Sequence, residues 1–124
     1  MANDLQRVVN KAATELLLEK QKKSREYKAQ AIAEFRKKVE KFLPNLDEWD
    51  FYIGQAVSSG TFQNPETEEE ISLKLTISDS DEGELHLKVS GLDDYAYIDD
   101  VWLFSQDDPP EALINHLANL ILKY

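Results

Sequence analysis

The stretch that decides the fold is ISLKLTI (residues 71–77), in which apolar and polar side chains alternate without exception. A period of two is typical of a strand with one buried face and one exposed face. LHLKV (residues 85–89) alternates in the same way, and DSDEG (residues 79–83) between them has the composition of a turn. Gly83 can supply the positive φ that such a turn needs. Together these segments predict an antiparallel hairpin.

Two further segments flank this hairpin and extend it to an antiparallel meander sheet of four strands. YAYIDDVWLF (residues 95–104) follows the turn GLDD (residues 91–94) and predicts the last strand, although its alternation is irregular. WDFYIGQAV (residues 49–57) has the pattern of a half-buried first strand. Its expected buried face consists of Trp49, Phe51, Ile53 and Val57. The sheet is therefore expected over residues 48–105.

The N-terminal third of the chain is predicted to be helical. Residues 1–43 contain no Gly or Pro, and their apolar residues recur at helical spacing until Pro44. The stretch 19–26 has no apolar residue on any face, and a straight helix of this length, about 60 Å, would exceed a compact body of about 30 Å. We therefore expect either a bend in this stretch or a helical arm over residues 1–20 followed by a core helix over residues 24–43.

The chain ends in a second predicted helix, over residues 108–123. Asp107 or Asp108 can cap it, and prolines follow at its first turn. Because four antiparallel strands leave one face open, this very apolar helix is expected to pack on the sheet. The expected architecture is a single α+β domain: a long, possibly bent N-terminal helix, a four-stranded antiparallel meander sheet and a C-terminal helix on the sheet.

The charge of the chain is strongly uneven. The formal net charge of the 124 residues is −10. Residues 1–43 hold 11 Lys/Arg and 6 Asp/Glu, a net charge of +5, whereas residues 44–124 hold 3 Lys/Arg and 18 Asp/Glu, a net charge of −15. Nucleic-acid binding is driven by Lys and Arg that displace counterions, so direct contact with nucleic acid is not expected.

The densest basic run, EKQKKSREYK (residues 19–28), does not change this conclusion. Its five basic side chains encircle the expected helix instead of lining one face, and Tyr27 is its only aromatic residue. We interpret the run as a solvated joint between the arm and the core helix. Its basic charge could also dock on the acidic body of the same chain or of a second copy.

Several protein classes are excluded or disfavoured by composition. The chain has no Cys, which excludes disulfides and thiolate chemistry. No apolar run approaches the roughly 20 residues of a membrane span, and the N-terminus lacks the pattern of a signal peptide. A cytoplasmic protein without membrane contact is therefore expected.

No pattern of catalytic or metal-binding residues is present. His86 and His116 have no Ser, Cys or acidic residue at a spacing typical of a triad or metal pair. The acidic turn that begins at Asp79 resembles the start of a calcium loop, but Gly83 falls at the fifth position instead of the sixth and Ser90 occupies the twelfth. We therefore expect no enzyme activity, no catalytic residue, no metal site and no cofactor.

The most suggestive stretch for recognition is the predicted last strand with the turn before it. On a strand, Asp93, Tyr95, Tyr97 and Asp99 would share one face, and tyrosines flanked by acids suit an Arg- and Lys-rich partner. The alternative is that the tyrosines pack under the N-terminal helix and the acids only solubilise the ends of the strand. The expected partner-binding residues are those of this stretch and of the acidic hairpin: Asp93, Asp94, Tyr95, Tyr97, Asp99, Asp100, Asp79, Asp81, Glu82 and Glu84.

Three functional hypotheses follow. The first is a non-enzymatic inhibitor that occupies a basic, often nucleic-acid-binding, surface of a partner protein, as phage anti-defence proteins that imitate the charge of DNA do. The second is an adaptor that forms a homodimer through its N-terminal helix. The third is an acidic dimeric secretion-type chaperone that holds an extended peptide at a sheet edge. The expected oligomerisation residues are Leu5, Val9, Ala12 and Leu16.

Overall fold

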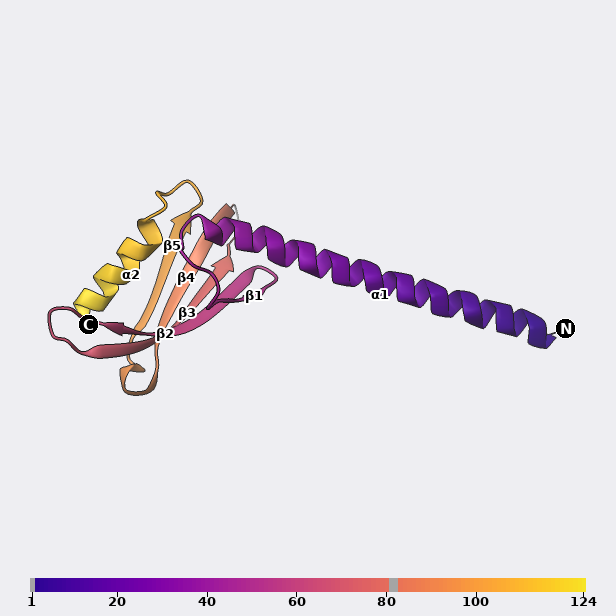
Figure 1. Cartoon of the computed structure of the whole chain (residues 1–124), viewed down its shortest axis with the longest axis horizontal. Helices are drawn as coiled ribbons and strands as arrows, with labels where there is room; N and C mark the ends of the chain where they lie inside the picture. Colours follow the sequence, from indigo (N-terminus) through magenta and orange to yellow (C-terminus); the bar gives the residue numbers. More distant parts are fainter. Residues whose placement is uncertain (1, 81–82) are drawn as a thin grey trace. The chain divides into compact units, whose positions relative to one another are not determined.

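The computed structural model describes residues 2–80 and 83–124, with side chains from Asp4 onward. The chain divides into two compact units, one up to Ala31 and one from Ile32 to Tyr124, and each is described by itself. The predicted α+β class and antiparallel sheet are confirmed (Figure 1). In chain order the elements are α1 (Ala2–Glu40), β1 (Asp50–Tyr52), β2 (Gln55–Gln63), β3 (Glu70–Asp79), β4 (Glu84–Gly91), η2 (Asp93–Tyr95), β5 (Asp99–Ser105) and α2 (Ala112–Lys123).

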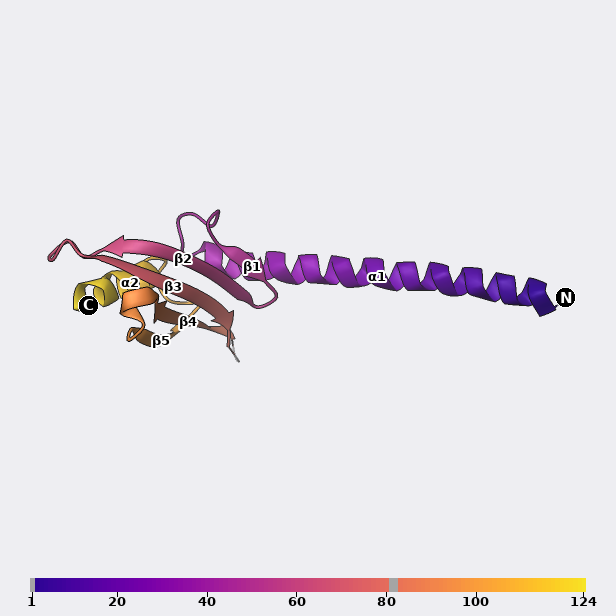
Figure 2. The same ribbon diagram turned by 90° about the horizontal axis from the view of Figure 1, so that it is seen from below.

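The central hairpin of β3 and β4 forms as the alternation predicts. Leu75 lies opposite Val89 and Ile77 lies opposite Leu87 in the antiparallel register. These apolar side chains are buried on one face of the sheet, while polar residues between them lie on the other face. The sheet order β1-β2-β3-β4-β5 follows the chain, so each strand pairs with its neighbours in sequence (Figure 2).

The prediction of four strands is wrong by one, because the segment expected as a single first strand folds as a tight hairpin. β1 and β2 pair antiparallel with Tyr52 opposite Gln55, which leaves only Ile53 and Gly54 to connect them. Gly54 adopts a φ of +65°, a conformation that costs little without a Cβ. Ile53, expected on the buried face, therefore lies in the turn with 51% of its surface exposed.

The last strand is shorter than predicted. It begins at Asp99, because residues 91–98 form a compact turn that contains the 3₁₀ helix η2. The amide of Gly91 donates to the carbonyl of Ile98, and the amide of Ile98 donates to that of Tyr95. A Cβ on Gly91 would lie 1.5 Å from the carbonyl oxygen of Tyr95, so only glycine fits this close approach. Asp93 itself has a positive φ of 52°.

Helical segments cover the buried face of the sheet. From α2, Leu113, Leu117 and Leu120 are buried, as predicted for a helix packed on the sheet. α2 begins at Ala112 rather than residue 108, and its N-cap position makes no side-chain hydrogen bond. Asp108, expected as a cap, instead accepts a hydrogen bond from the Ser105 amide at 2.8 Å.

The C-terminal part of α1 contributes to the same core. Phe35 and Val39 of α1 and Phe42 in the turn directly after it are buried, and the rings of Phe42 and Phe104 meet edge to face with centroids 5.0 Å apart. The core therefore contains aromatic and aliphatic side chains from α1, α2 and all strands except the shortest, β1, whose Phe51 is half-buried beside it.

The N-terminal unit consists of α1 up to Ala31. α1 is helical without interruption from Ala2 to Glu40, so the basic run at 19–28 does not break it. Residues 4–30 are exposed throughout, so the exposed part of the helix extends beyond the residue 20 expected as the end of the arm. Among the described residues, no helix has the length and apolar character to cross a membrane.

Candidate functional site

The predicted acidic recognition strand does not exist as one face. Asp93 and Asp94 lie in η2, whereas Asp99 and Asp100 are consecutive residues of β5 and so point to opposite faces of the sheet. The expectation that Asp93, Tyr95, Tyr97 and Asp99 share a strand face is therefore wrong, because the turn closed by Gly91 places the first three before the strand. Asp93, Asp94, Tyr97 and Asp99 remain exposed.

The two tyrosines of this turn differ in environment. Tyr95 is half-buried against the core, while Tyr97 is 66% exposed. The Tyr97 ring lies between those of Tyr95 and Tyr124, with centroids 6.3 Å and 6.1 Å apart. Desolvation, followed by the negative charge of Glu69, raises the pKa of the Tyr95 hydroxyl above its ordinary value of 10.0. The turn thus combines one anchored and one exposed aromatic ring beside carboxylates.

Asp100 has a structural contact that sequence spacing did not reveal. Its Oδ2 lies 2.8 Å from Nε2 of His116 on α2, and the His116 ring stacks on Trp102 with centroids 4.3 Å apart. Asp100, Trp102 and Phe104 alternate along β5 and so face α2 together. The alternation along residues 100–104 is the signal that places Asp100 on the face toward α2, in contrast to the exposed recognition surface expected from the sequence.

The acidic hairpin at residues 79–84 is only partly available for recognition. Asp79 ends β3 and forms an ion pair with Lys38 of α1, whose Nζ lies 3.3 Å from the carboxylate. Glu84 begins β4 and is exposed. Asp81 and Glu82, expected as binding residues, lie outside the described residues. Because both partners of the ion pair are more than a third exposed, its contribution to stability is small.

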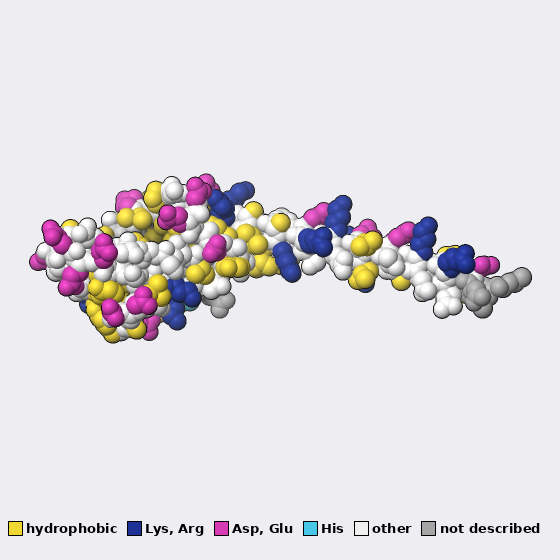
Figure 3. Space-filling view, turned by 60° about the horizontal axis from the view of Figure 1, so that its bottom comes forward, with side chains coloured by type: hydrophobic (Ala, Val, Ile, Leu, Met, Phe, Trp, Pro, Cys, Tyr) yellow, Lys and Arg dark blue, Asp and Glu magenta, His cyan; other side chains and the backbone are white. Residues whose placement is uncertain are grey.

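Within α1, the four residues expected to mediate oligomerisation lie in the exposed N-terminal segment. With Val8 they form an apolar stripe, since a turn of 100° per residue places all five within roughly a third of the helix circumference. Figure 3 shows apolar, basic and acidic side chains exposed along α1. The N-terminal stripe consists of Leu5, Val8, Val9, Ala12 and Leu16.

A cleft that the sequence did not indicate opens between β2 and α2. Residues Ser58 and Gly60 of β2 are in register with buried Leu75 and Leu73, so they face the core side of the sheet. Their small size leaves space where large apolar side chains would otherwise pack. The cleft has a volume of about 280 Å³, and it is lined by Leu43, Glu48, Trp49, Ser58, Ser59, Gly60, Thr61, Phe62, Leu75, Ile114 and Leu117.

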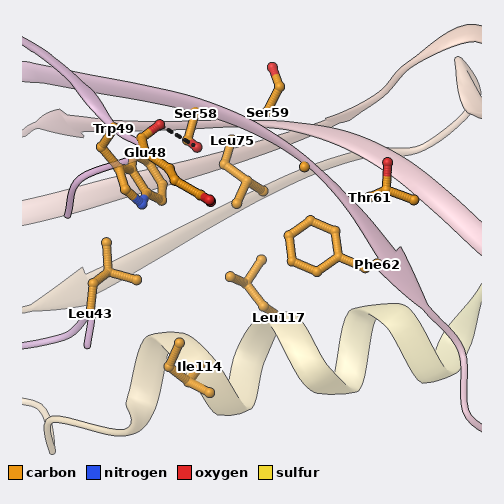
Figure 4. A pocket seen from close by; sticks show the side chains of 11 residues that line it. Leu43, Glu48, Trp49, Ser58, Ser59, Thr61, Phe62, Leu75, Ile114 and Leu117 are labelled. Atoms are coloured by element: carbon orange, nitrogen blue, oxygen red, sulfur yellow. Dashed lines mark hydrogen bonds between the residues drawn. The ribbon is translucent and has the colours of Figure 1, made fainter. Parts of the chain in front are cut away.

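Apolar side chains line most of this cleft, and the carboxylate of Glu48 lies near one end (Figure 4). Phe62, Leu75 and Leu117 form an apolar floor, and the Trp49 ring closes one end. The Ser58 hydroxyl donates to the backbone carbonyl of Glu48 at 3.1 Å. The side-chain carboxylate of Glu48 is directed toward the cleft. The site therefore combines aliphatic and aromatic walls with a single carboxylate.

A free strand edge runs beside the cleft. β1 pairs only with residues 55–57 of β2, whereas β3 pairs with β2 along its whole length (Figure 2). Within the described ranges, residues 59–63 therefore have a strand neighbour on one side only. Acidic residues follow in the turn to β3, namely Glu66, Glu68 and Glu69, and Glu70 begins β3.

Comparisons with known proteins assign no relative to this chain. No protein-family model matches it, and neither the curated proteins nor the solved structures include a significant match. Among the described residues, no group of three or more His, Asp or Glu side chains is placed to hold a metal ion.

Proposed function

We propose that the chain is a non-enzymatic adaptor that self-associates through the N-terminal stripe and presents its acidic body to a partner protein. The observation that carries this proposal is the exposure of large apolar side chains on α1. Between 55% and 68% of the surface of four members of the stripe is exposed: Leu5, Val8, Val9 and Leu16. Contiguous apolar surface of this kind is characteristic of interaction sites.

The energetics of apolar burial favour a weak association. Burying half of a Leu or Val side chain contributes about 1 kcal/mol. The stripe and the neighbouring Leu17, counted on two chains, would thus contribute roughly 8–10 kcal/mol, which is of the same order as the entropic cost of association. Exposed single helices are also only marginally stable in water, so pairing would stabilise the helix itself. The net free energy of association is therefore small, and a weak dimer that is populated only toward high micromolar protein concentration is expected.

A second copy in antiparallel orientation is the occupant that best fits the charges. Two oppositely charged residues one turn apart flank the stripe on one side: Lys11 is basic and Glu15 is acidic. In an antiparallel helix pair this side of the stripe faces its own copy in reverse. With Val9 opposite Leu16 of the second copy, Lys11 of each helix lies near Glu15 of the other.

A parallel pair is electrostatically less favourable. It would place the basic run 19–28 of one helix beside the same run of the other, and each run carries five basic and two acidic residues. In the antiparallel register these runs extend beyond opposite ends of the paired segment. The charge layout therefore supports both the choice of a second copy as partner and its orientation.

Sedimentation equilibrium over a range of roughly 1 to 200 µM tests this proposal. We expect a monomer–dimer equilibrium, and we expect Leu16→Glu to abolish it because a charge would enter the apolar contact. Asn10→Glu is the matched control, since residue 10 lies on the opposite side of the helix and should leave the equilibrium unchanged. Circular dichroism verifies that both variants remain helical. A monomer at every concentration would refute self-association.

The exposed acids of the body support a second candidate function, binding to a basic surface of another protein. Asp93, Asp94 and Asp99 are exposed around Tyr97, whose ring can supply short-range contact. In this case affinity for a basic partner should fall steeply between low and moderate salt, because long-range attraction is screened. Replacing Asp93 and Asp94 with Asn should weaken binding, and affinity independent of salt would exclude the proposed charge mimicry.

A further inference from the structure

We propose that the free edge of β2 at residues 59–63, together with the neighbouring cleft, binds an extended peptide segment that carries a Lys or Arg side chain. The peptide would add a strand to the sheet beside β2, and its basic side chain would enter the cleft. This site is separate from the N-terminal stripe, and it does not depend on self-association.

The edge of β2 at residues 59–63 lacks the features that normally prevent strand addition. Sheet edges are commonly protected by charged residues, prolines or short strands. The opposite edge strand, β5, begins with Asp99 and Asp100, and the short strand β1 begins with Asp50. Residues 59–63, with the sequence SGTFQ, have neither charge nor proline. Five residues of free edge are sufficient for a short added strand.

The cleft matches a single Lys or Arg side chain in size and in chemistry. A volume of about 280 Å³ is at or below the lower limit of ordinary ligand pockets, so it suits a side chain better than a larger ligand. The alkyl part of Lys or Arg can lie on Phe62 and Leu117, while its charged end reaches the Glu48 carboxylate (Figure 4). Trp49 offers an aromatic surface for the same cation.

The surroundings of the edge are acidic. Glu48 lies at one end of the cleft, the turn after β2 contains three glutamates, and a fourth, Glu70, begins β3. Neighbouring residues of a bound peptide would therefore be favoured if they were basic or neutral and disfavoured if they were acidic. Charge and cleft together select a basic extended segment from the many peptides that could pair with a strand edge.

A fluorescence-polarisation titration tests this inference with labelled seven-residue peptides of alternating Thr and Val around a central residue. We expect the peptide with central Arg to bind and its norleucine counterpart to bind roughly tenfold more weakly, the effect of losing one charge-assisted contact. The peptide with central Glu should not bind measurably. N-methylation of alternate amides on the pairing side should abolish binding if the peptide adds as a strand.

Variants of the protein identify the site. Gly60→Val should abolish binding by filling the cleft, and Glu48→Gln should weaken the Arg peptide about tenfold while leaving the norleucine peptide unchanged. Thr76→Val, on the opposite face of β3, is the control and should bind as the unmodified protein does. Circular dichroism tests whether Gly60→Val still folds, and Glu48→Gln decides the question independently because Glu48 is exposed.

Two results would overturn the inference. One is the absence of binding by the Arg peptide at millimolar concentration. The other is binding that persists after N-methylation or is insensitive to Glu48→Gln, because either result would indicate charge attraction elsewhere on the acidic body. The same titration with Leu16→Glu distinguishes this site from the N-terminal stripe, since peptide affinity should not change in that variant.

Discussion

Nε2 of His116 lies 2.8 Å from Oδ2 of Asp100, which links α2 to the edge strand β5. The His116 side chain is only 24% exposed, and its imidazole ring is also held by stacking on Trp102. Polar contacts at such partly buried positions stabilise a fold because each group would otherwise lack its hydrogen-bond partner. The acid therefore has a structural role in holding the C-terminal helix on the sheet.

Removing this link should destabilise the body. We expect Asp100→Ala to lower the free energy of unfolding by roughly 1–3 kcal/mol, since it leaves His116 without its partner. Urea denaturation measures the change, and a double-mutant cycle with His116→Ala isolates the interaction between the two side chains. Asp99→Ala is the matched control on the exposed face of β5. Equal effects of the two Asp substitutions would contradict the assigned role.

The raised pKa of Tyr95 should make stability depend on pH in the alkaline range. Its pKa in the folded protein lies above the ordinary value of 10.0, so the folded state binds this proton more tightly than the unfolded state. The associated stability is present below pH 10 and is lost as the pH rises through the folded pKa. Urea midpoints between about pH 8 and pH 11 should fall more steeply for the unmodified protein than for Tyr95→Phe. Tyr27→Phe, at an exposed position of α1, is the control substitution.

The close approach at Gly91 should make this glycine difficult to replace. A Cβ there would lie 1.5 Å from the Tyr95 carbonyl oxygen, so the turn must open to accommodate it. We expect Gly91→Ala to cost about 3 kcal/mol or more. At Gly60 the nearest atoms are in the Phe62 ring at 3.4 Å, and Gly60→Ala should change stability by less than about 1 kcal/mol. Similar urea midpoints for the two variants would contradict this account of the turn.

The N-terminal segment should be separable from the folding of the body. Residues 4–30 are exposed, and the buried core residues begin at Phe35. Deletion of residues 1–20 should therefore leave the unfolding free energy of the body within about 0.5 kcal/mol of the original value at low protein concentration. The same deletion should remove the concentration dependence of the sedimentation behaviour. A large loss of stability at low concentration would show that these residues support the core.

The strength of local patterns explains which parts of the fold were predictable. The alternation in β3 and β4 and the apolar face of α2 depend on side chains every two or every three to four residues, and both predictions are confirmed. The hairpin at Gly54 was not predicted, because the residues on both sides of the turn continue an apolar pattern. The compact turn before β5 was missed because its conformation depends on a contact between Gly91 and Tyr95.

The candidate sites also differ in whether a local sequence pattern could predict them. The N-terminal stripe could be predicted because helical periodicity within residues 5–16 is a local signal. The cleft depends on the register of β2 against β3, which places Ser58 and Gly60 opposite buried leucines. No local sequence pattern predicts that Ser58 and Gly60 face the core. The strand was also expected to end at Val57, before these two residues. The free edge of β2 likewise becomes apparent only when the short extent of β1 is known.

Disulfide trapping tests the central claim most directly, because the chain contains no native Cys. In an antiparallel pair, residue 9 of one helix lies opposite residue 16 of the other, within the Cα separation of about 4.4–6.8 Å that a disulfide needs. An equimolar mixture of Val9→Cys and Leu16→Cys should therefore form a cross-linked heterodimer under mild oxidation, while each variant alone should cross-link much less. Efficient cross-linking of Val9→Cys with itself would indicate a parallel pair, and no cross-link in any mixture would contradict self-association through this helix.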